Sequence, residues 1–364
     1  MKPRERVAAA LEHEQPDRAP FQASFAPEAA ARLRAELGLP VAPAPNPYGS
    51  GNPHDLEIAL REDVLLTSVG WSNSYHQRPS DELDEWGVGW RLVPYTTPYG
   101  EGHYPDVISH PLADAASLAG YRAPDPDREQ LYAHATHTLF SYQDDYWIAG
   151  VTIATIFDTA WALRGLEQLL IDFVVDPDLA DAILEIPYRY HRAAAQRLTR
   201  MGVDMIVIGD DIAHRGGLLI SPVHWRRFLK PRLAELISAL RALNAQLKIA
   251  YHSDGNVQAL VPELIEIGVD VLHPAQPSAM DLETCKRRYG RSLSLWGTLD
   301  DEQTLPFGSE AEVRREVRRR IRGLGRGGGL IVGPTHELGI DIPPGNVWAM
   351  VEEATGVVTR GVID

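Results

Sequence analysis

Residues 248–257 read KIAYHSDGNV, and the interpretation of the whole chain starts from this stretch. Ile249–Tyr251 is a short apolar run between a charged residue and a turn, which is typical of a buried strand. His252 and Asp254 would stand where that strand ends, before a Gly-Asn turn and a helical pattern. In parallel α/β folds, ligands bind at the carboxyl ends of the strands. We therefore place His252 and Asp254 at the edge of an active site.

Short apolar runs alternate with helical patterns over residues 204–333, which predicts βαβ units and a parallel sheet. Trp147–Ala154 and two N-terminal candidates, Phe21–Phe25 and Asp63–Gly70, bring the number of strands close to eight. The best interpretation is an α/β protein with a (β/α)8 TIM barrel and N-terminal helical and loop insertions. A doubly wound open sheet is the alternative.

Residues 1–364 are predicted to form a single domain, with one irregular insertion. Trp71–Pro111 is rich in Tyr, Trp, His, Pro and Gly, which predicts hairpins and loops near the site. A cluster of aromatic residues is usually part of a core, but here Ser, Asn, Gly and Pro interrupt it, which equally favours a lid over a flat or apolar ligand. The substrate-binding candidates in this insertion are Trp71, His76 and Trp86.

Composition restricts the class of protein. The net charge of −15 opposes binding to nucleic acid or to anionic membranes. No apolar run is long enough to span a membrane, and the charged N-terminus does not have the pattern of a secretion signal. The single cysteine, Cys285, excludes an intramolecular disulfide and a multi-thiolate metal site within one chain. We therefore expect a cytoplasmic protein that acts on a small molecule.

Carboxylates follow several predicted strands. Asp210 and Asp211 end the strand 204–208, and because adjacent side chains point in different directions, only one is expected to face the centre. A lone acidic or hydroxyl side chain at a strand end is often a helix N-cap, and this is the alternative for each of these residues and for Ser221. The catalytic candidates are Asp158, Asp210 and Glu337, and the further substrate-binding candidates are Asp211, Ser221, Asn256 and Gln276.

A metal site is the second hypothesis for the strand ends. His252, Asp254 and His336 would ligate zinc with an open fourth position, since two His and one carboxylate form a known catalytic ligand set. Glu337 would be a further ligand or a base. No His-Glu-x-x-His spacing supports this site, so the hypothesis depends on the fold bringing the residues together.

Six segments resemble the uroporphyrinogen decarboxylase superfamily, and they cover nearly the whole chain. Within that superfamily the chain is most similar to the methyltransferase-like branch, which includes methylcobalamin:coenzyme M methyltransferase and corrinoid-linked O-demethylases. The resemblance implies a TIM barrel and a homodimer. The segments are RERVAAALEHEQPDRAP, DEWGVGW, GDDIAHRGGLLISP, HSDGNVQALVPELIEIGVDVLHPAQ, LWGTLDDEQTLPFG and GGGLIVGPTHELGIDIPPGN.

The resemblance implies three activities. Decarboxylases of this family hold propionates with N-terminal arginines, but Phe25–Ala31 reads FAPEAAA and lacks that pattern. Thiol-activating methyltransferases bind zinc through His-x-Cys and a later Cys, whereas this chain has Asp254 after His252, and His336 near the place of the later Cys. Corrinoid-linked demethylases use His and carboxylate ligands, which matches this set better.

We therefore predict a corrinoid-linked methyltransferase that acts on a small methylated molecule and has a zinc site at the barrel mouth. Methylcobalamin or a corrinoid carrier protein would be the co-substrate. Cofactor-free uroporphyrinogen decarboxylase activity is the first alternative. A non-catalytic barrel that binds a tetrapyrrole or corrinoid is the second.

Overall fold

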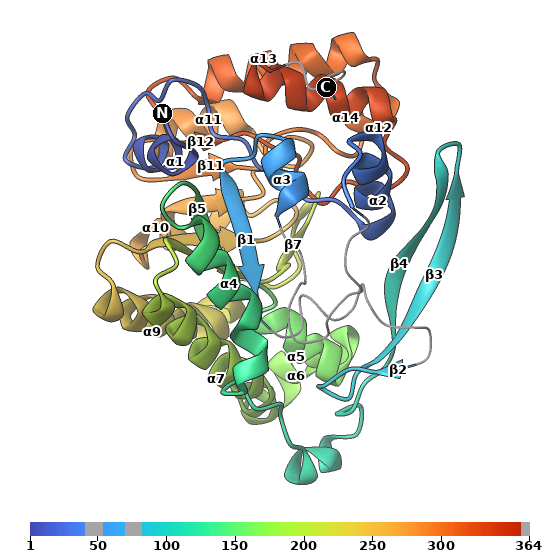
Figure 1. Ribbon diagram of the computed structural model, residues 1–364. Coiled ribbons are helices and arrows are strands. Elements are labelled where there is room, and N and C mark those ends of the chain that lie inside the picture. The colour runs from blue at the N-terminus through green and yellow to red at the C-terminus, as the bar shows by residue number, and fades with distance from the viewer. Residues whose placement is uncertain (41–53, 70–81, 358–364) are drawn as a thin grey trace.

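A curled parallel sheet organises the protein (Figure 1). The computed structural model describes residues 1–40, 54–69 and 82–357. Each strand of this sheet is parallel to its neighbours, and the strands follow one another around it in chain order. They are β1 (Val64–Ser68), β5 (Trp147–Val151), β6 (Met205–Gly209), β9 (Lys248–His252), β10 (Val271–His273), β11 (Ser294–Trp296) and β12 (Leu330–Ile331).

The segment Phe21–Phe25 closes this sheet into a barrel. It forms parallel bridges to the chain after β12, from Phe21 to Val332 and from Phe25 to Leu338. On its other side, the carbonyl of Phe21 accepts a hydrogen bond of 2.8 Å from the backbone N–H of Asp63, directly before β1. The predicted (β/α)8 class is confirmed, and the alternative of an open sheet is wrong because both sheet edges are joined through this segment. The predicted strand itself is reduced to isolated bridges.

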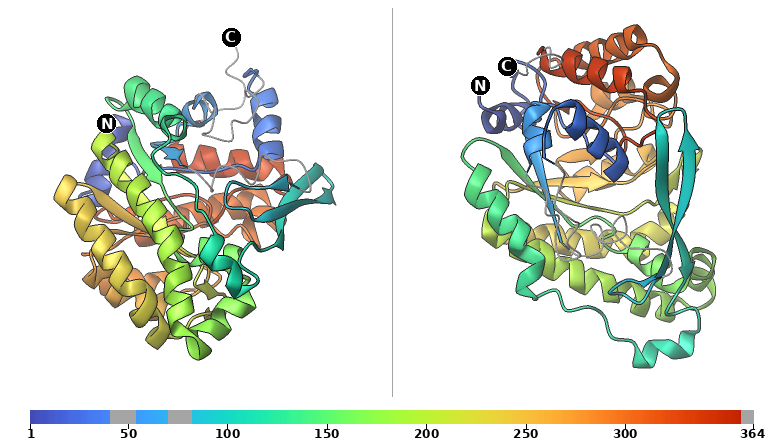
Figure 2. Two further views of the ribbon diagram at one scale, coloured as in Figure 1. Left: turned by 90° about the horizontal axis from the view of Figure 1, so that it is seen from below. Right: turned by 45° about the vertical axis from the view of Figure 1, so that its right-hand side comes forward.

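Apolar side chains fill the barrel interior, and helix α1 (Pro3–Leu11) closes its amino-terminal end (Figure 2). Val7 and Leu11 of α1 pack on the inward-facing residues of the strands. Such a filled interior is a packed core and not a pore. The inward-facing residues of this layer include Val64, Trp147, Ala149, Met205, Ala250, Val271, Trp296 and Ile331.

Helices surround the sheet, and none among those described has the length and apolar composition needed to cross a membrane. They are α2 (Pro27–Glu36), α3 (Asp55–Ala59), α4 (Ala133–Tyr142), α5 (Phe157–Arg164), α6 (Leu166–Val175), α7 (Pro177–Met201), α8 (Pro222–His224), α9 (Lys230–Leu243), α10 (Val261–Glu266), α11 (Leu282–Tyr289), α12 (Thr304–Phe307), α13 (Glu310–Leu324) and α14 (Pro344–Thr355).

Two predicted helices are interrupted in the structure. The predicted helix Ala162–Val174 is divided between α5 and α6, because Gly165 between them adopts a φ of +93°, which an α-helix cannot contain. The predicted helix Pro222–Leu243 passes through a π-helical turn at Trp225–Leu229 between α8 and α9. Helix α13 begins and ends at the predicted residues.

The insertion forms an antiparallel hairpin that stands beside the barrel (Figure 2), so the prediction of hairpins is confirmed for its described part. Its strands are β2 (Glu82–Leu83), β3 (Gly89–Thr97) and β4 (Gly100–Ser109). Asp84 organises the turn before β3, because its carboxylate accepts hydrogen bonds from the N–H groups of Trp86 and Val88 and from Trp90 Nε1. The DEWGVGW motif therefore has a structural role here. Trp71 and His76 lie outside the described residues.

A buried carboxylate joins α1, the closing segment and β1. Asp63 is fully buried and accepts hydrogen bonds from Arg6 Nη1 at 2.5 Å, Arg18 Nη1 at 2.7 Å and the backbone N–H of Phe21 at 2.8 Å. Arg6 is also buried, and its guanidinium binds Asp17 at 2.6 Å. Two cations and a backbone donor satisfy the carboxylate, so its burial is compatible with a stable fold.

We expect Asp63→Asn to lower the free energy of unfolding by about 3–5 kcal/mol, because the substitution removes the buried negative charge that pairs with both Arg6 and Arg18. Denaturant titration followed by circular dichroism measures this loss. Asp106→Asn is the matched control, since Asp106 pairs with Arg91 on the exposed hairpin and its loss should cost less than about 1 kcal/mol. Equal effects of the two substitutions would contradict the role assigned to Asp63.

Candidate active site and metal centre

A cavity of about 180 Å³ opens among the carboxyl ends of the barrel strands. One part of its wall is apolar and comes from the barrel strands and the chain directly after them. These residues are Leu66, Val151, Ile153, Val207 and Trp296. Another part is polar and holds three imidazoles and one carboxylate. The described polar residues that line it are Gln22, Ser24, His252, His273, Thr335, His336 and Glu337.

Asp211, His252 and Asp254 form a candidate metal centre beside this cavity. One ligand atom from each lies within 4.8 Å of the other two. The pairing of β6 with β9 places Gly209 opposite His252, so the residues after Gly209 meet the residues after His252. The structure thus brings together two of the three predicted zinc ligands. Asp211, which we predicted to bind substrate, takes the third place, and His336 does not belong to this cluster.

Two glycines allow the loops of this centre to approach closely. Gly209 has a φ of +131°, and a Cβ atom there would lie 2.0 Å from the backbone oxygen of His252. Gly255 has a φ of +85°, and a Cβ atom there would lie 2.7 Å from the backbone nitrogen of His214 in the short strand β7 (Ala213–His214). Any side chain at these positions would push apart the segments that carry Asp211 and Asp254.

A second histidine orients His252. The Nδ1 atoms of His252 and His273 are 2.8 Å apart, and Nε2 of His252 lies 3.5 Å from Asp211 Oδ1. Burial, together with His252 and His336, holds the pKa of His273 well below its ordinary value, so its ring is neutral and can accept a hydrogen bond. His252 can then donate its Nδ1–H to His273, which leaves the Nε2 lone pair facing Asp211. This is the tautomer that a metal ligand requires.

The two carboxylates of the cluster are held against each other by the fold. Asp211 Oδ1 accepts a hydrogen bond of 2.8 Å from the backbone N–H of Asp254. Burial raises the pKa of Asp254, and the neighbouring Asp211 raises it further, although His252 and His336 oppose this. Two carboxylates in partial burial are stabilised by a proton or a cation between them. The donor set of one imidazole and two carboxylates therefore fits a divalent metal ion.

Asp210 and Asp158 hold the backbone segments next to the site through hydrogen bonds. Asp210 Oδ1 accepts hydrogen bonds from the N–H groups of Ile156 and Asp158, and so caps the start of α5. Asp158 Oδ2 accepts one of 2.9 Å from the N–H of Asp211. Burial raises the pKa of Asp210 to about 7 and that of Asp158 well above its ordinary value. The carboxyl groups of Asp210 and Asp158 are buried and do not line the cavity, which indicates a positioning role. Asp210 and Asp211 point in different directions, as predicted.

Three predicted substrate-binding residues are engaged in local hydrogen bonds. Gln276 Oε1 accepts a hydrogen bond of 2.8 Å from the N–H of Gly255, which fixes the loop after Asp254. Asn256 Oδ1 accepts one from the N–H of Gln258. Ser221 is the N-cap of α8, as the alternative interpretation of this residue proposed. None of the three lines the cavity.

Trp86 also lies away from the cavity. Its ring packs edge-on against Tyr190 with a centroid distance of 4.9 Å and stacks on His191 at 6.0 Å. It is 1% exposed, and its contacts are those of a core residue between the insertion and α7.

His336 and Glu337 lie together on the polar wall, where we predicted them to face the site. Burial lowers the pKa of His336, but the carboxylates of Asp254, Glu337 and Asp301 outweigh it and raise the pKa above its ordinary value. Asp301 accepts a hydrogen bond from the Thr335 hydroxyl. His336 therefore lies in an acidic surrounding that favours its protonated form.

Gln22, Ser24, His273 and Trp296 form a chain of contacts in the wall that the sequence does not predict. Trp296 Nε1 donates a hydrogen bond of 3.1 Å to Gln22 Oε1, and Gln22 Nε2 donates to Ser24 Oγ. The fourth is His273, whose ring lies 4.5 Å from that of Trp296, between centroids. His273 ends β10 and belongs to no catalytic sequence motif. The other three residues belong to short apolar segments that carry no catalytic motif, so only the closure of the barrel reveals them.

Comparison with known proteins assigns the fold family. The family model described as "Uroporphyrinogen decarboxylase (URO-D)" matches residues 94–357. The chain belongs to the uroporphyrinogen decarboxylase family. It is 26% identical over 281 residues to the uroporphyrinogen decarboxylase of Methylococcus capsulatus, covering 74% of each chain. It is 21% identical over 261 residues to that of Pseudoalteromonas atlantica, covering 67% of this chain and 69% of the other.

A solved structure of this fold is a methyltransferase from Methanosarcina mazei. The superposition covers 98% of this chain and 99% of the other with a TM-score of 0.71, at 19% sequence identity. At this identity the likeness shows that the fold is shared. The predicted family resemblance is confirmed, and a fold by itself does not determine the chemistry that it carries.

We expect Gly209→Ala to destabilise the protein by at least about 2 kcal/mol more than Gly202→Ala, as measured by denaturant titration. Both glycines have positive φ, +131° and +103°, but no atom lies within 4 Å of a Cβ atom at Gly202. The control therefore carries the backbone strain without the collision with His252. Equal losses of stability in the two variants would show that the close approach of β6 and β9 does not require glycine at position 209.

Proposed function

We propose that this protein is a metal-dependent methyltransferase that removes a methyl group from a small molecule and passes it to a corrinoid co-substrate. The observation that carries the proposal is the convergence of Asp211, His252 and Asp254 beside a small cavity that has one apolar and one polar wall. The fold shared with the methyltransferase from Methanosarcina mazei is consistent with it.

Zinc is the metal that we propose for this centre. Imidazole and carboxylate groups are zinc ligands, and three protein ligands leave a fourth position for a substrate atom. When bound, zinc supplies Lewis-acid polarisation of a substrate oxygen or sulfur. Asp254 stands in the place where thiol-activating enzymes carry a cysteine, and this carboxylate is a harder ligand than a thiolate, which favours an oxygen-containing substrate.

The residues of the cavity have distinct roles in this proposal. Val151, Val207 and Trp296 surround the methyl-bearing part of the substrate and exclude water. His273 holds the ring of His252 in the ligand tautomer. When the bond between the methyl group and oxygen breaks, the oxygen keeps the electron pair, and His336 donates a proton from its ring to that oxygen.

Porphyrinogen decarboxylation is the second candidate, because two relatives carry that name. A porphyrinogen carries several carboxylates, which require cationic partners. No Lys or Arg is present among the described residues that line the cavity. This lining favours an uncharged small molecule as the substrate. We therefore expect the protein not to convert uroporphyrinogen to coproporphyrinogen. A non-catalytic tetrapyrrole-binding or corrinoid-binding barrel is the third candidate.

Metal analysis of the purified protein tests the proposed centre. We expect about one zinc ion per chain in the wild type and loss of zinc in His252→Ala and Asp211→Ala, since each removes one of three ligands. His103→Ala is the matched control, because His103 lies on the exposed hairpin and pairs with Glu28. Wild-type protein that is folded and free of metal would contradict the proposed zinc site.

His336→Ala separates two possible ligand sets. Zinc retained in this variant supports the cluster of Asp211, His252 and Asp254, whereas zinc lost would instead support the set of His252, Asp254 and His336 predicted from the sequence.

Turnover tests the reaction itself. We expect the wild type to convert reduced cobalamin to methylcobalamin in the presence of a methyl phenyl ether, with release of the phenol, which the corrinoid spectrum reports directly. His252→Ala should lower the rate at least about 100-fold, since the variant loses the imidazole that holds the metal. His103→Ala should keep the rate of the wild type. Binding of methylcobalamin without turnover would favour the non-catalytic barrel, and formation of coproporphyrinogen would favour the decarboxylase.

A further inference from the structure

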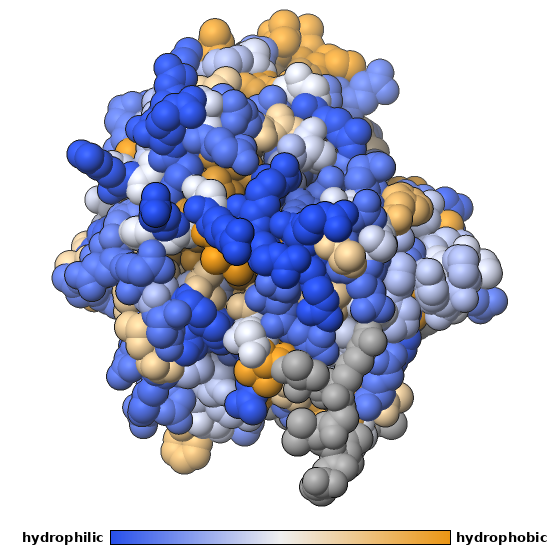
Figure 3. Space-filling view, turned by 90° about the horizontal axis from the view of Figure 1, so that it is seen from above, coloured by the Kyte–Doolittle hydropathy of each residue, from blue (hydrophilic) through white to orange (hydrophobic). Residues whose placement is uncertain are grey.

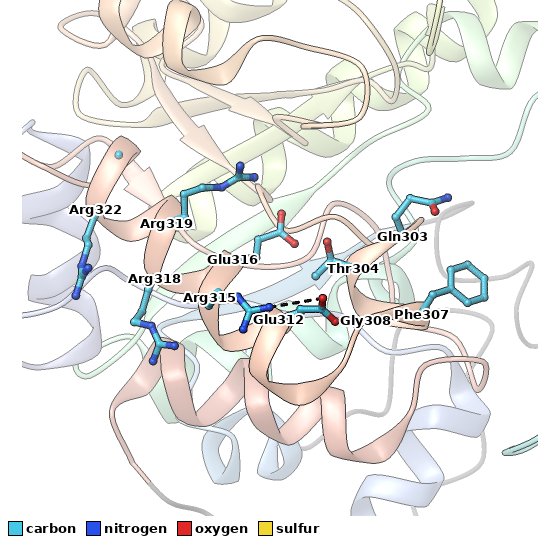
Figure 4. Close-up of a pocket in the computed structure, with 11 residues that line it drawn as sticks. Gln303, Thr304, Phe307, Gly308, Glu312, Arg315, Glu316, Arg318, Arg319 and Arg322 are labelled. Atoms are coloured by element: carbon cyan, nitrogen blue, oxygen red, sulfur yellow. Dashed lines mark ion pairs between the residues drawn. The ribbon is translucent and has the colours of Figure 1, made fainter.

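A groove of about 1010 Å³ lies between α12 and the outer face of α13, away from the metal centre (Figure 4). Four arginines of α13 line it with helical spacing i, i+3, i+4 and i+7, which places them on one face of the helix. We call Arg315, Arg318, Arg319 and Arg322 the arginine stripe.

Within the part of the chain that the structure describes, half of the arginine stripe has no charge partner. Arg318 pairs with Glu353 at 2.9 Å, and Arg315 lies 3.5 Å from Glu312. Arg319 and Arg322 are exposed and have no carboxylate within ion-pair distance among residues 1–40, 54–69 and 82–357. This face is dominated by hydrophilic side chains (Figure 3). On a chain with a net charge of −15, it leaves local positive charge uncompensated.

An exposed aromatic ring lies at one end of the same groove. Phe307 of α12 is 79% exposed, and Figure 4 shows its ring projecting outward at the opposite end from Arg322. Phenylalanine and arginine are the residue types enriched in the cores of protein interfaces. A dissolved anion would use the arginines but would leave Phe307 in water.

Carboxylates within the groove restrict the kind of anion that fits. Glu312 and Glu316 also line it, and Glu316 Oε2 is buried without a hydrogen-bond partner among the described residues. A continuous polyphosphate would meet these acids with like charge, whereas a protein segment can place carboxylates against the arginines and neutral side chains beside the acids.

We propose that this groove binds an acidic amphipathic segment of another protein. Glutamates or aspartates of that segment pair with Arg319 and Arg322, and an apolar side chain covers Phe307. Such an interface gains association rate and specificity from the charges and affinity from the buried ring.

The groove is connected to the mouth of the barrel through the loop after β11. Gln303 and Thr304 line the groove and directly follow Asp301 and Glu302. Asp301 binds the Thr335 hydroxyl of the cavity wall, and Glu302 accepts a hydrogen bond of 2.8 Å from Gln276 Nε2. A partner in the groove would therefore contact a loop whose preceding residues reach the cavity wall, and its binding does not depend on the proposed methyl transfer.

Fluorescence anisotropy with the full-length protein tests this proposal. The probe is a synthetic helix-forming peptide with glutamates at i, i+3, i+4 and i+7 and one tryptophan as the apolar anchor. We expect it to bind at low salt and to weaken as salt rises. The double variant Arg319→Glu/Arg322→Glu should weaken binding at least about tenfold, and Phe307→Ser should weaken it without changing the salt dependence.

The matched control is Arg189→Glu/Arg200→Glu, which makes the same charge change on the exposed side of α7. Retained binding in this control supports the groove, and equal weakening in both double variants overturns it as a general charge effect. Binding of inorganic polyphosphate or of anionic phosphatidylserine vesicles in place of the peptide would also overturn it. So would dissociation of a homodimer by Arg319→Glu/Arg322→Glu, since a second copy would then be the occupant.

Discussion

The buried carboxylate of Asp63 is the interaction on which the barrel depends. It holds Arg6 of α1, Arg18 of the first turn and the backbone N–H of Phe21 at one point below β1. Without this junction the closing segment would have only isolated bridges to keep it between β12 and β1. A carboxylate buried among two guanidinium groups and a backbone donor is stable only in this arrangement, so it also specifies which segments meet.

Closure of the barrel creates the site at the opposite end of the strands. The glycine that ends β6 allows the backbones of β6 and β9 to lie in contact, and Asp211 then reaches His252 and Asp254. Behind them, Asp210 and Asp158 are used to cap α5 and to hold the Asp211 backbone. Polar groups close to the site therefore divide into those that face the cavity and those that hold the loops, and their hydrogen bonds distinguish the two kinds.

Family membership and chemistry are separate conclusions for this chain. The family match rests on nearly three quarters of the residues, and on a barrel whose strand ends can carry different side chains. The proposed methyl transfer rests instead on which donors converge and on the absence of cations among the described lining residues. The arginine stripe contributes to neither conclusion. It lies on α13, whose inward face packs on the rest of the barrel.

The sequence by itself determined the barrel class, most helices and the two central site residues, His252 and Asp254. Alternating apolar runs and helical patterns are local signals, and a strand end identifies itself by the turn that follows. Only the tertiary structure decided that Asp211 completes the cluster while His336 lies outside it, and that Trp86, Ser221, Asn256 and Gln276 serve the fold. These roles depend on which side of a loop a side chain points to and on which distant backbone it meets. Spacing along the chain does not encode either property.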